Sequence, residues 1–256
     1  MVTASTKRID ENLSVSNIVT ADYRTADVFR KYGIEICCGG KLPLKTVCGL
    51  KELNLDSIKK DLQESTRNIC LPNSLKSEEW GVDFLTDYIV NIHHEYLKKT
   101  LPETKDALLR FVESHQDRFT YLPNLLKIFI ELSNYTLPHL QEEEDIIFPY
   151  IRQISHAYNS KESYAALLVR TLRKPVENVM NHENESLTAL LQQMRQLTDD
   201  YIPPERACTS HRVVFSKLLE IDNDLVQHLY LETIFFSRKR SQWKKNYLRE
   251  MIECPE

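Results

Sequence analysis

Two short stretches of this sequence decide the fold, His139-Leu140-Gln141-Glu142-Glu143 and His228-Leu229-Tyr230-Leu231-Glu232. Each places a carboxylate four residues after a histidine. On an α-helix such side chains share a face, with Cβ atoms about 5–6 Å apart. A similar apolar stretch follows each motif, Asp145-Ile146-Ile147-Phe148 and Thr233-Ile234-Phe235-Phe236. The pattern predicts two helices that each present a histidine and a glutamate to one metal centre.

Two further histidines extend this pattern along the chain. His94, His139, His182 and His228 are separated by nearly even intervals of 45, 43 and 46 residues. One histidine then falls in each of four helices, and such side chains can meet at one level inside an up-down bundle. A single histidine–glutamate pair on a helix is ordinarily a solvent-exposed pair. Two such pairs in phase with two more histidines favour a metal site over packed or exposed histidines.

The distribution of glycine supports a helical fold. All five glycines lie in the first 81 residues, whereas a β-rich domain would need glycine at its turns and bulges. Apolar periodicity and prolines predict four long helices, near residues 83–98, 123–148, 175–197 and 204–236. We expect Pro102 and Pro138 to kink or reset helices. The expected fold class is all-α, a four-helix bundle preceded by a small helical N-terminal domain.

The polar, turn-like segment Leu71–Ser77 is the predicted domain boundary. It divides a small helical domain at residues 1–75 from a bundle at residues 76–236, and a basic extension follows at residues 237–256. In the small domain we expect one helix over Asn17–Tyr32 that stops at Gly33. Shorter helices are expected near Val47–Leu53 and Ser57–Glu64.

Composition excludes several functional classes. Thirty-three Lys and Arg against 37 Asp and Glu give a net charge of -4 over 256 residues, so no nucleic-acid partner is expected. No apolar run approaches the length of a membrane span, and the first residues lack the apolar core of a secretory signal. Six cysteines without an export signal indicate reduced thiols. We therefore expect a cytoplasmic protein without membrane contact.

Four imidazoles and two carboxylates suit a pair of iron ions, each bound by two histidines and bridged by both glutamates. The absence of thiolate disfavours a structural zinc site and fits iron or manganese better. Six protein ligands cannot saturate two six-coordinate ions. We therefore expect an oxo- or hydroxo-bridged di-iron centre, with positions open to small ligands such as oxygen or nitric oxide.

The other histidines and acidic residues near the motifs receive simpler interpretations. His115, His156 and His211 lie off the spacing and are predicted at the surface or in loops. His93 points about 100° away from His94 around the helix. A solvated acidic face is expected for the carboxylates beside Glu143, although one of them can contact a ligand from outside the centre; these carboxylates are Glu142, Glu144 and Asp145.

The second unusual motif is Cys37-Cys38-Gly39-Gly40. Adjacent cysteines point in different directions on a regular backbone, so they suit a single tetrahedral zinc poorly. The glycines give access to the sulfurs, and a following helix N-terminus would lower a thiol pKa. Two small buried side chains at a helix end are an equally good interpretation. The remaining cysteines, with no metal-binding spacing, are expected in packing: Cys48, Cys70, Cys208 and Cys254.

The run Phe29–Gly40, followed by this bundle and by Pro203–Thr209, resembles the hemerythrin-like di-iron proteins that repair iron–sulfur clusters. The resemblance assigns the family's cysteine pair to Cys37 and Cys38. It assigns the iron ligands to the six residues reached from spacing: His94, His139, Glu143, His182, His228 and Glu232.

The resemblance implies a cytoplasmic stress-response protein, associated with homodimers, that restores clusters damaged by nitric oxide or peroxide. It would act by supplying iron to damaged iron–sulfur proteins. The cysteine pair would receive iron, handle nitrosyl groups or supply reducing equivalents. Two departures stand out. Leu97 replaces a histidine that often follows the first ligand by three residues, and Phe236-Ser237-Arg238 replaces the family's Phe-Pro ending.

Two other functions fit the same ligands. One is a di-iron nitric oxide reductase, and the other is an oxygen or nitric oxide sensor that signals by a change of shape. Gas carriage alone needs no thiol, so the cysteine pair favours repair or redox chemistry. Neither motif separates iron donation from nitric oxide turnover, because both need an accessible di-iron centre.

Overall fold

The computed structural model describes residues 9–36, 40–66, 79–162, 164–165, 167–168 and 175–233, with side chains between 175 and 183 excluded. Cys37 and Cys38, the His182 side chain, the predicted boundary segment and the predicted basic extension therefore lie outside the described residues. The described part of the chain is helical and contains no strand beyond an isolated bridge between Ser14 and Pro43. The expected all-α class is thereby confirmed.

The chain divides into two compact units. Unit 1 comprises Met1–Leu75 and Thr198–Leu219, and unit 2 comprises Lys76–Leu197 and Glu220–Glu256.

Unit 1 contains four short helices, α1 (Val15–Ala21), α2 (Thr25–Lys31), α3 (Leu44–Leu50) and α4 (Leu55–Ser65). Ser14 and Asn54 cap α1 and α4 by accepting backbone N–H groups. Their apolar faces share one core, whose fully buried side chains are Val15, Phe29, Leu44, Ile58 and Leu62.

The single helix predicted over Asn17–Tyr32 is wrong, because Asp22 separates α1 from α2. Asp22 adopts an extended backbone, with φ -155° and ψ 107°. Its carboxylate accepts the Arg24 backbone N–H, and its carbonyl accepts the Thr25 hydroxyl. These local hydrogen bonds replace the backbone hydrogen bonds that a continuous helix would form here. Gly33 does end the helical segment, in the left-handed conformation at φ 64°.

Gly40 lies two residues after the cysteine pair. Its carbonyl accepts the Ser16 backbone N–H at 2.9 Å, which joins residue 40 to α1. A Cβ atom at Gly40 would lie 2.5 Å from the Ile36 carbonyl oxygen. The backbone at Gly40 therefore lies too close to the Ile36 carbonyl for a side chain, and only glycine fits at position 40.

The first long helical segment of unit 2 consists of α5 (Val82–Tyr88), the π-helical turn η2 (Ile89–His94) and α6 (Glu95–His115). A hydrogen bond characteristic of a π-turn joins the Glu95 N–H to the Val90 carbonyl, five residues earlier in the chain. Asn91 Nδ2 donates to the Asp87 carbonyl at 2.8 Å. Pro102 lies inside α6 and does not end it.

The second long segment repeats this arrangement. It consists of α7 (Leu122–Glu142), the π-helical turn η3 (Glu143–Ile147) and α8 (Phe148–Asn159). The Phe148 N–H donates to the Glu143 carbonyl. Pro138 lies inside α7, so neither Pro102 nor Pro138 resets a helix. The segment extends to Asn159, beyond the predicted end at Phe148.

The remaining long helices are α10 (Pro175–Thr198) and α11 (Thr209–Thr233). The start of α10 agrees with the sequence, whereas α11 begins at Thr209 rather than near Pro204. Arg195 of α10 pairs with the buried Asp222 carboxylate of α11. In α10 the apolar side chains of one face are buried at helical spacing, namely Leu187, Leu190, Leu191 and Met194.

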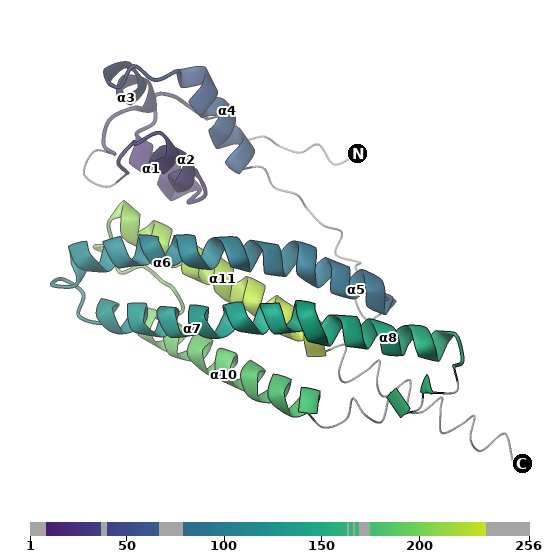
Figure 1. Ribbon diagram of the computed structural model, residues 1–256. Coiled ribbons are helices and arrows are strands. Elements are labelled where there is room, and N and C mark those ends of the chain that lie inside the picture. The colour runs from purple at the N-terminus through teal and green to yellow at the C-terminus, as the bar shows by residue number, and fades with distance from the viewer. Residues whose placement is uncertain are drawn as a thin grey trace, which may run out of the picture. The chain divides into compact units, whose positions relative to one another are not determined.

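The helices of unit 2 form the predicted bundle. α6 packs along α7, and α5 packs against α8, as Figure 1 shows. A core cluster fills the α5–α8 end and includes Leu85, Ile89, Phe148 and Ile154. Among the described residues, no helix is both long and apolar enough to cross a membrane.

Candidate metal centre

Five of the six predicted ligands are described, and all five lie together in unit 2. His94 is the last residue of η2, His139 lies in the last turn of α7, and Glu143 is the first residue of η3. His228 and Glu232 come from the final turns of α11. Each of the five has an exposed fraction of 2% or less.

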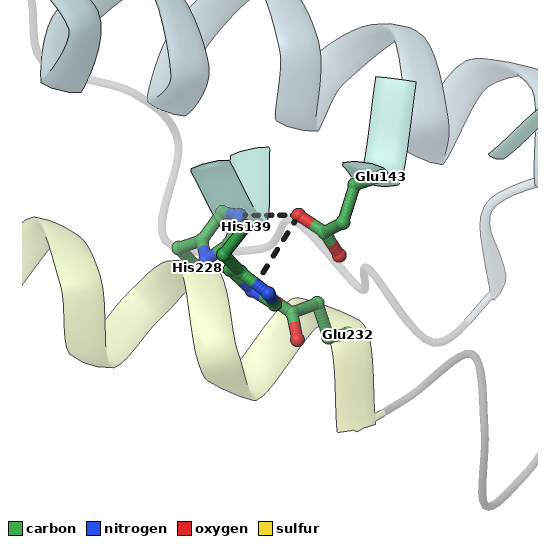
Figure 2. A group of neighbouring side chains, drawn as sticks. All are labelled: His139, Glu143, His228 and Glu232. Carbon is green, nitrogen blue, oxygen red and sulfur yellow. Dashed lines mark ion pairs between the residues drawn. The ribbon is translucent and has the colours of Figure 1, made fainter. Parts of the chain in front are cut away.

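Glu143 lies between the imidazoles. Its Oε2 is 3.2 Å from His94 Nε2, 3.3 Å from His228 Nε2 and 3.8 Å from His139 Nε2. Figure 2 shows this carboxylate oxygen facing the histidines. The Nε2 atoms of His94 and His228 are only 3.0 Å apart. Two imidazole nitrogens this close share a proton or a cation, because two lone pairs alone would repel.

Glu232 closes the other side of the cluster (Figure 2). Its Oε1 is 2.7 Å from His228 Nδ1 and 3.7 Å from His139 Nε2. Its Oε2 accepts a hydrogen bond of 2.9 Å from Asn184 Nδ2 of α10. Sequence analysis missed Asn184, which carries no signal in the histidine spacing.

The arrangement fits a bound cation. One donor atom each from His139, Glu143, His228 and Glu232 lies within 4.8 Å of the others. Both carboxylate oxygens of Glu143 are buried and accept no hydrogen bond of good geometry from the described residues. A buried carboxylate without such bonds costs several kcal/mol unless a positive charge compensates it. A bound metal ion would provide that charge.

The pKa shifts of the cluster residues also indicate that the site favours positive charge. Burial lowers the pKa of His228, but the carboxylates of Glu232 and Glu143 outweigh burial and raise this pKa to about 10. Burial raises the pKa of Glu232, yet the neighbouring His228 and His139 imidazoles hold it far below its ordinary value. The cluster therefore stabilises positive charge among its carboxylates.

One residue of the predicted acidic face contacts the centre from outside. Glu144 Oε1 is 2.6 Å from His94 Nδ1, and Lys98 Nζ donates to both Glu144 oxygens at 2.8 and 2.7 Å. The predicted contact of a neighbouring carboxylate with a ligand is therefore confirmed for Glu144. Asp145, by contrast, is exposed and accepts a hydrogen bond from Gln141.

The other histidines divide between core and surface. His93 is buried, with Nδ1 3.0 Å from Asp224 Oδ1. His156 is exposed and pairs with Asp83, as expected for a surface histidine. His115 is half-buried and stacks on Phe111. The prediction for His211 is wrong, because it is fully buried in α11 against Phe215.

The donor set indicates which metals would bind. Imidazole nitrogen and carboxylate oxygen suit iron, manganese or a catalytic zinc, and no thiolate of the described residues joins the cluster. Cys48 is buried in the core of unit 1, as predicted for packing.

Comparison with known proteins places this geometry in a family. A family profile described as the hemerythrin HHE cation binding domain matches residues 86–237, which include all six predicted ligands. The chain belongs to this hemerythrin family. A second profile, described as a domain of unknown function (DUF542), matches residues 11–66. The combination of a small N-terminal domain with a hemerythrin-like bundle is thereby confirmed.

Several curated proteins are similar to this hemerythrin-family chain over most of their length. The iron–sulfur cluster repair protein ScdA of Staphylococcus epidermidis is 28% identical over 89% of this chain and 97% of its own. The iron–sulfur cluster repair protein YtfE of Enterobacter sp. (strain 638) is 27% identical, covering 88% and 94%. YtfE of Escherichia coli O81 is 28% identical, covering 84% and 90%. The family resemblance seen in the sequence is confirmed.

Proposed function

We propose that this chain is a di-iron protein that repairs damaged iron–sulfur clusters by donating iron. The observation that carries the proposal is the buried cluster of three imidazoles and two carboxylates, in a chain that belongs to a cation-binding family. Two kinds of relatives, ScdA and YtfE, are both named iron–sulfur cluster repair proteins. These names favour repair over nitric oxide reduction and gas sensing, which the same metal site would also fit.

Two iron ions fit the donors. Glu143 has both oxygens unsatisfied by good hydrogen bonds and is suited to bridging. Glu232 and four imidazoles would supply the remaining protein ligands, with His182 of α10 completing the predicted set of six. Six protein ligands leave coordination positions open, so iron in this centre would remain accessible to small ligands.

The protein residues in this proposal bind and release iron. Only two of the proposed ligands are anionic. They would therefore neutralise less of the positive charge of bound iron than the ligands of a thiolate-rich site do. A centre of this kind holds iron less firmly than a closed cysteine site, as donation requires. The three imidazoles must present unprotonated nitrogens to iron, so loading the centre displaces protons.

The remaining expectations are part of the same proposal. Its partners would be iron–sulfur proteins damaged by nitric oxide or peroxide, in the cytoplasm of stressed cells, and the protein would act as a homodimer. Thiolate binds iron well, so Cys37 and Cys38 would hold iron on its way to a client.

Metal analysis and a reactivation assay test the proposal. We expect about two irons per chain in the purified protein. His139→Ala should lose iron, whereas His156→Ala, a control that removes an exposed histidine paired with Asp83, should retain it. Iron-loaded protein is then mixed anaerobically with an enzyme whose cluster has lost iron.

Reactivation with a matching loss of iron from the loaded protein supports donation. Sustained nitrous oxide formation from nitric oxide, without iron loss, would instead identify a nitric oxide reductase. Zinc as the only metal, or iron content unaffected by His139→Ala, would contradict the proposed centre.

A further inference from the structure

A chain of three side chains connects the buried centre with the protein surface. His94 is fully buried, whereas Glu144 and Lys98 have exposed side-chain fractions of 20% and 32%. His94 Nδ1 lies 2.6 Å from Glu144 Oε1, and Lys98 Nζ lies 2.7 Å from Glu144 Oε2. Lys98 follows His94 by four residues, so both project from one face of the η2–α6 helical segment.

The hydrogen bond to Glu144 orients the His94 ring. When Nδ1 carries the proton and donates it to the carboxylate, the Nε2 lone pair is directed into the cluster. Nε2 is the atom that lies 3.2 Å from Glu143 Oε2. A carboxylate acceptor on the outer nitrogen also makes an imidazole a stronger donor to a metal. Glu144 therefore strengthens His94 as a ligand.

Lys98 acts on the same carboxylate in the opposite sense. Its ammonium group donates to both oxygens of Glu144. It thereby competes with His94 for the electron density of the carboxylate. A weaker acceptor polarises the imidazole less, so Lys98 weakens the effect of Glu144 on His94.

We propose that Glu144 and Lys98 are positioning residues that set the rate of iron release by acting through His94 in opposite directions. The inference rests on the proposed iron-donating function and adds to it a device that adjusts how firmly iron is held. Neither residue touches the metal. An ion pair that faces solvent contributes little to stability, but here one carboxylate oxygen also binds a buried imidazole of the centre.

Two substitutions with opposite expected effects test the inference. Protein loaded with ferrous iron is mixed anaerobically with an excess of a coloured ferrous chelator, and the rate of iron loss is followed by absorbance. Glu144→Gln retains the shape of the side chain but removes its charge, and iron loss should become about tenfold faster. Lys98→Met should slow iron loss roughly threefold, and Lys98→Arg should leave the rate near that of the wild type.

Matched controls remove the same charges without the contact. Asp145→Asn changes the adjacent, exposed carboxylate, and Lys99→Met changes the adjacent, exposed lysine. Both should leave the rate of iron loss unchanged. Because Lys98 acts through Glu144, Lys98→Met should have no further effect when Glu144→Gln is already present.

The thermal stability of each metal-free variant separates this role from simple packing. A structural role predicts that both variants lose stability and release iron faster. Faster release from Lys98→Met, unchanged release from Glu144→Gln, or additive effects in the double variant would overturn the inference while leaving the iron centre intact. A wild-type protein that binds no iron would overturn the proposed function itself.

Discussion

At the scale of single residues, buried charge identifies the centre. Glu143 and Glu232 have no exposed surface, and neither is paired with a lysine or arginine among the described contacts. The described groups that face them are the imidazoles of the cluster and, at Glu232, the Asn184 amide. A fold retains such an arrangement when positive charge, on the imidazoles or on a bound cation, offsets the desolvation of the two carboxylates. The buried His93 and the partly exposed Asp224 form a separate pair next to the centre, with the His93 ring 6.1 Å from that of His228.

Two glycines give opposite predictions for the same substitution. A Cβ at Gly40 would lie 2.5 Å from a backbone oxygen, whereas a Cβ at Gly49, inside α3, would have no neighbour within 4 Å. Gly40→Ala should therefore lower the free energy of unfolding by about 1–3 kcal/mol. Gly49→Ala should raise it by about 0.5–1 kcal/mol. Denaturant unfolding of the full chain measures both, and a stabilising Gly40→Ala would contradict the close approach to Ile36.

Residue types and spacing were sufficient to predict that five of the proposed ligands lie together, but not what surrounds them. The four-residue spacing brings His139 and Glu143 together on any helix, and the same holds for His228 and Glu232. Asn184 contacts Glu232 only because α10 packs beside α11, and periodicity within one helix cannot reveal that contact. His211 was assigned to the surface because it lies off the spacing, yet tertiary packing against Phe215 buries it.

At the scale of elements, two π-helical turns contain proposed ligands. His94 ends η2 and Glu143 begins η3. A π-turn inserts one residue into a helix and changes the direction of the side chains that follow. Apolar periodicity of 3.6 predicts the long helices but not these insertions. The first two segments also extend beyond their predicted ends, to His115 and Asn159. Pro102 and Pro138 also showed that packing overrides the local tendency of proline to end a helix.

Deletion of Asn91 tests the π-turn in η2. Without this residue the segment should return to α-helical register, which rotates α5 by about 100° relative to His94. Either α5 loses its packing against α8 or His94 leaves the cluster. We expect lower thermal stability of the metal-free protein and an iron content below that of the wild type. Deletion of Asp117, in the connection between α6 and α7, is the control and should retain iron. Normal stability and normal iron in the Asn91 deletion would refute this role of η2.

A polar contact between α2 and α4 predicts a dependence of stability on pH. Hydrogen bonds from Lys31 and then Tyr32 lower the pKa of Asp61 below its ordinary 3.8. A carboxyl group with a lowered folded-state pKa stabilises the fold above its unfolded-state pKa, and this contribution disappears as the pH falls through the folded-state value. Asp61→Asn should therefore be less stable than the wild type between pH 5 and pH 7, by an amount that shrinks below about pH 3.8. Urea unfolding across this range measures the difference, and a gap that widens in acid would contradict the assignment.

At the scale of the whole molecule, two family profiles match different parts of the chain. The cation-binding match covers residues 86–237, and the N-terminal match covers residues 11–66 with the cysteine pair inside it. Composition and glycine distribution predicted the helical class because a long segment without glycine accommodates helices and few tight turns. The break at Asp22 was not predictable from apolar spacing, because side-chain bonds to the local backbone decide it.

The cysteine pair provides the prediction that distinguishes storage of iron from its delivery. If unit 2 alone binds iron, Cys37→Ser combined with Cys38→Ser should leave about two irons per chain while repair of a damaged cluster enzyme is largely lost. The reason is chemical: serine binds iron weakly, whereas a thiolate can take iron from an imidazole–carboxylate centre.

Cys208→Ser is the control for this prediction. It changes a partly exposed thiol of unit 1 outside the pair and should preserve both iron content and repair. Iron content by metal analysis and recovery of client activity are measured on the same samples. Iron lost with the pair would make the cysteines ligands or folding determinants, and unimpaired repair would mean that iron leaves the bundle without them.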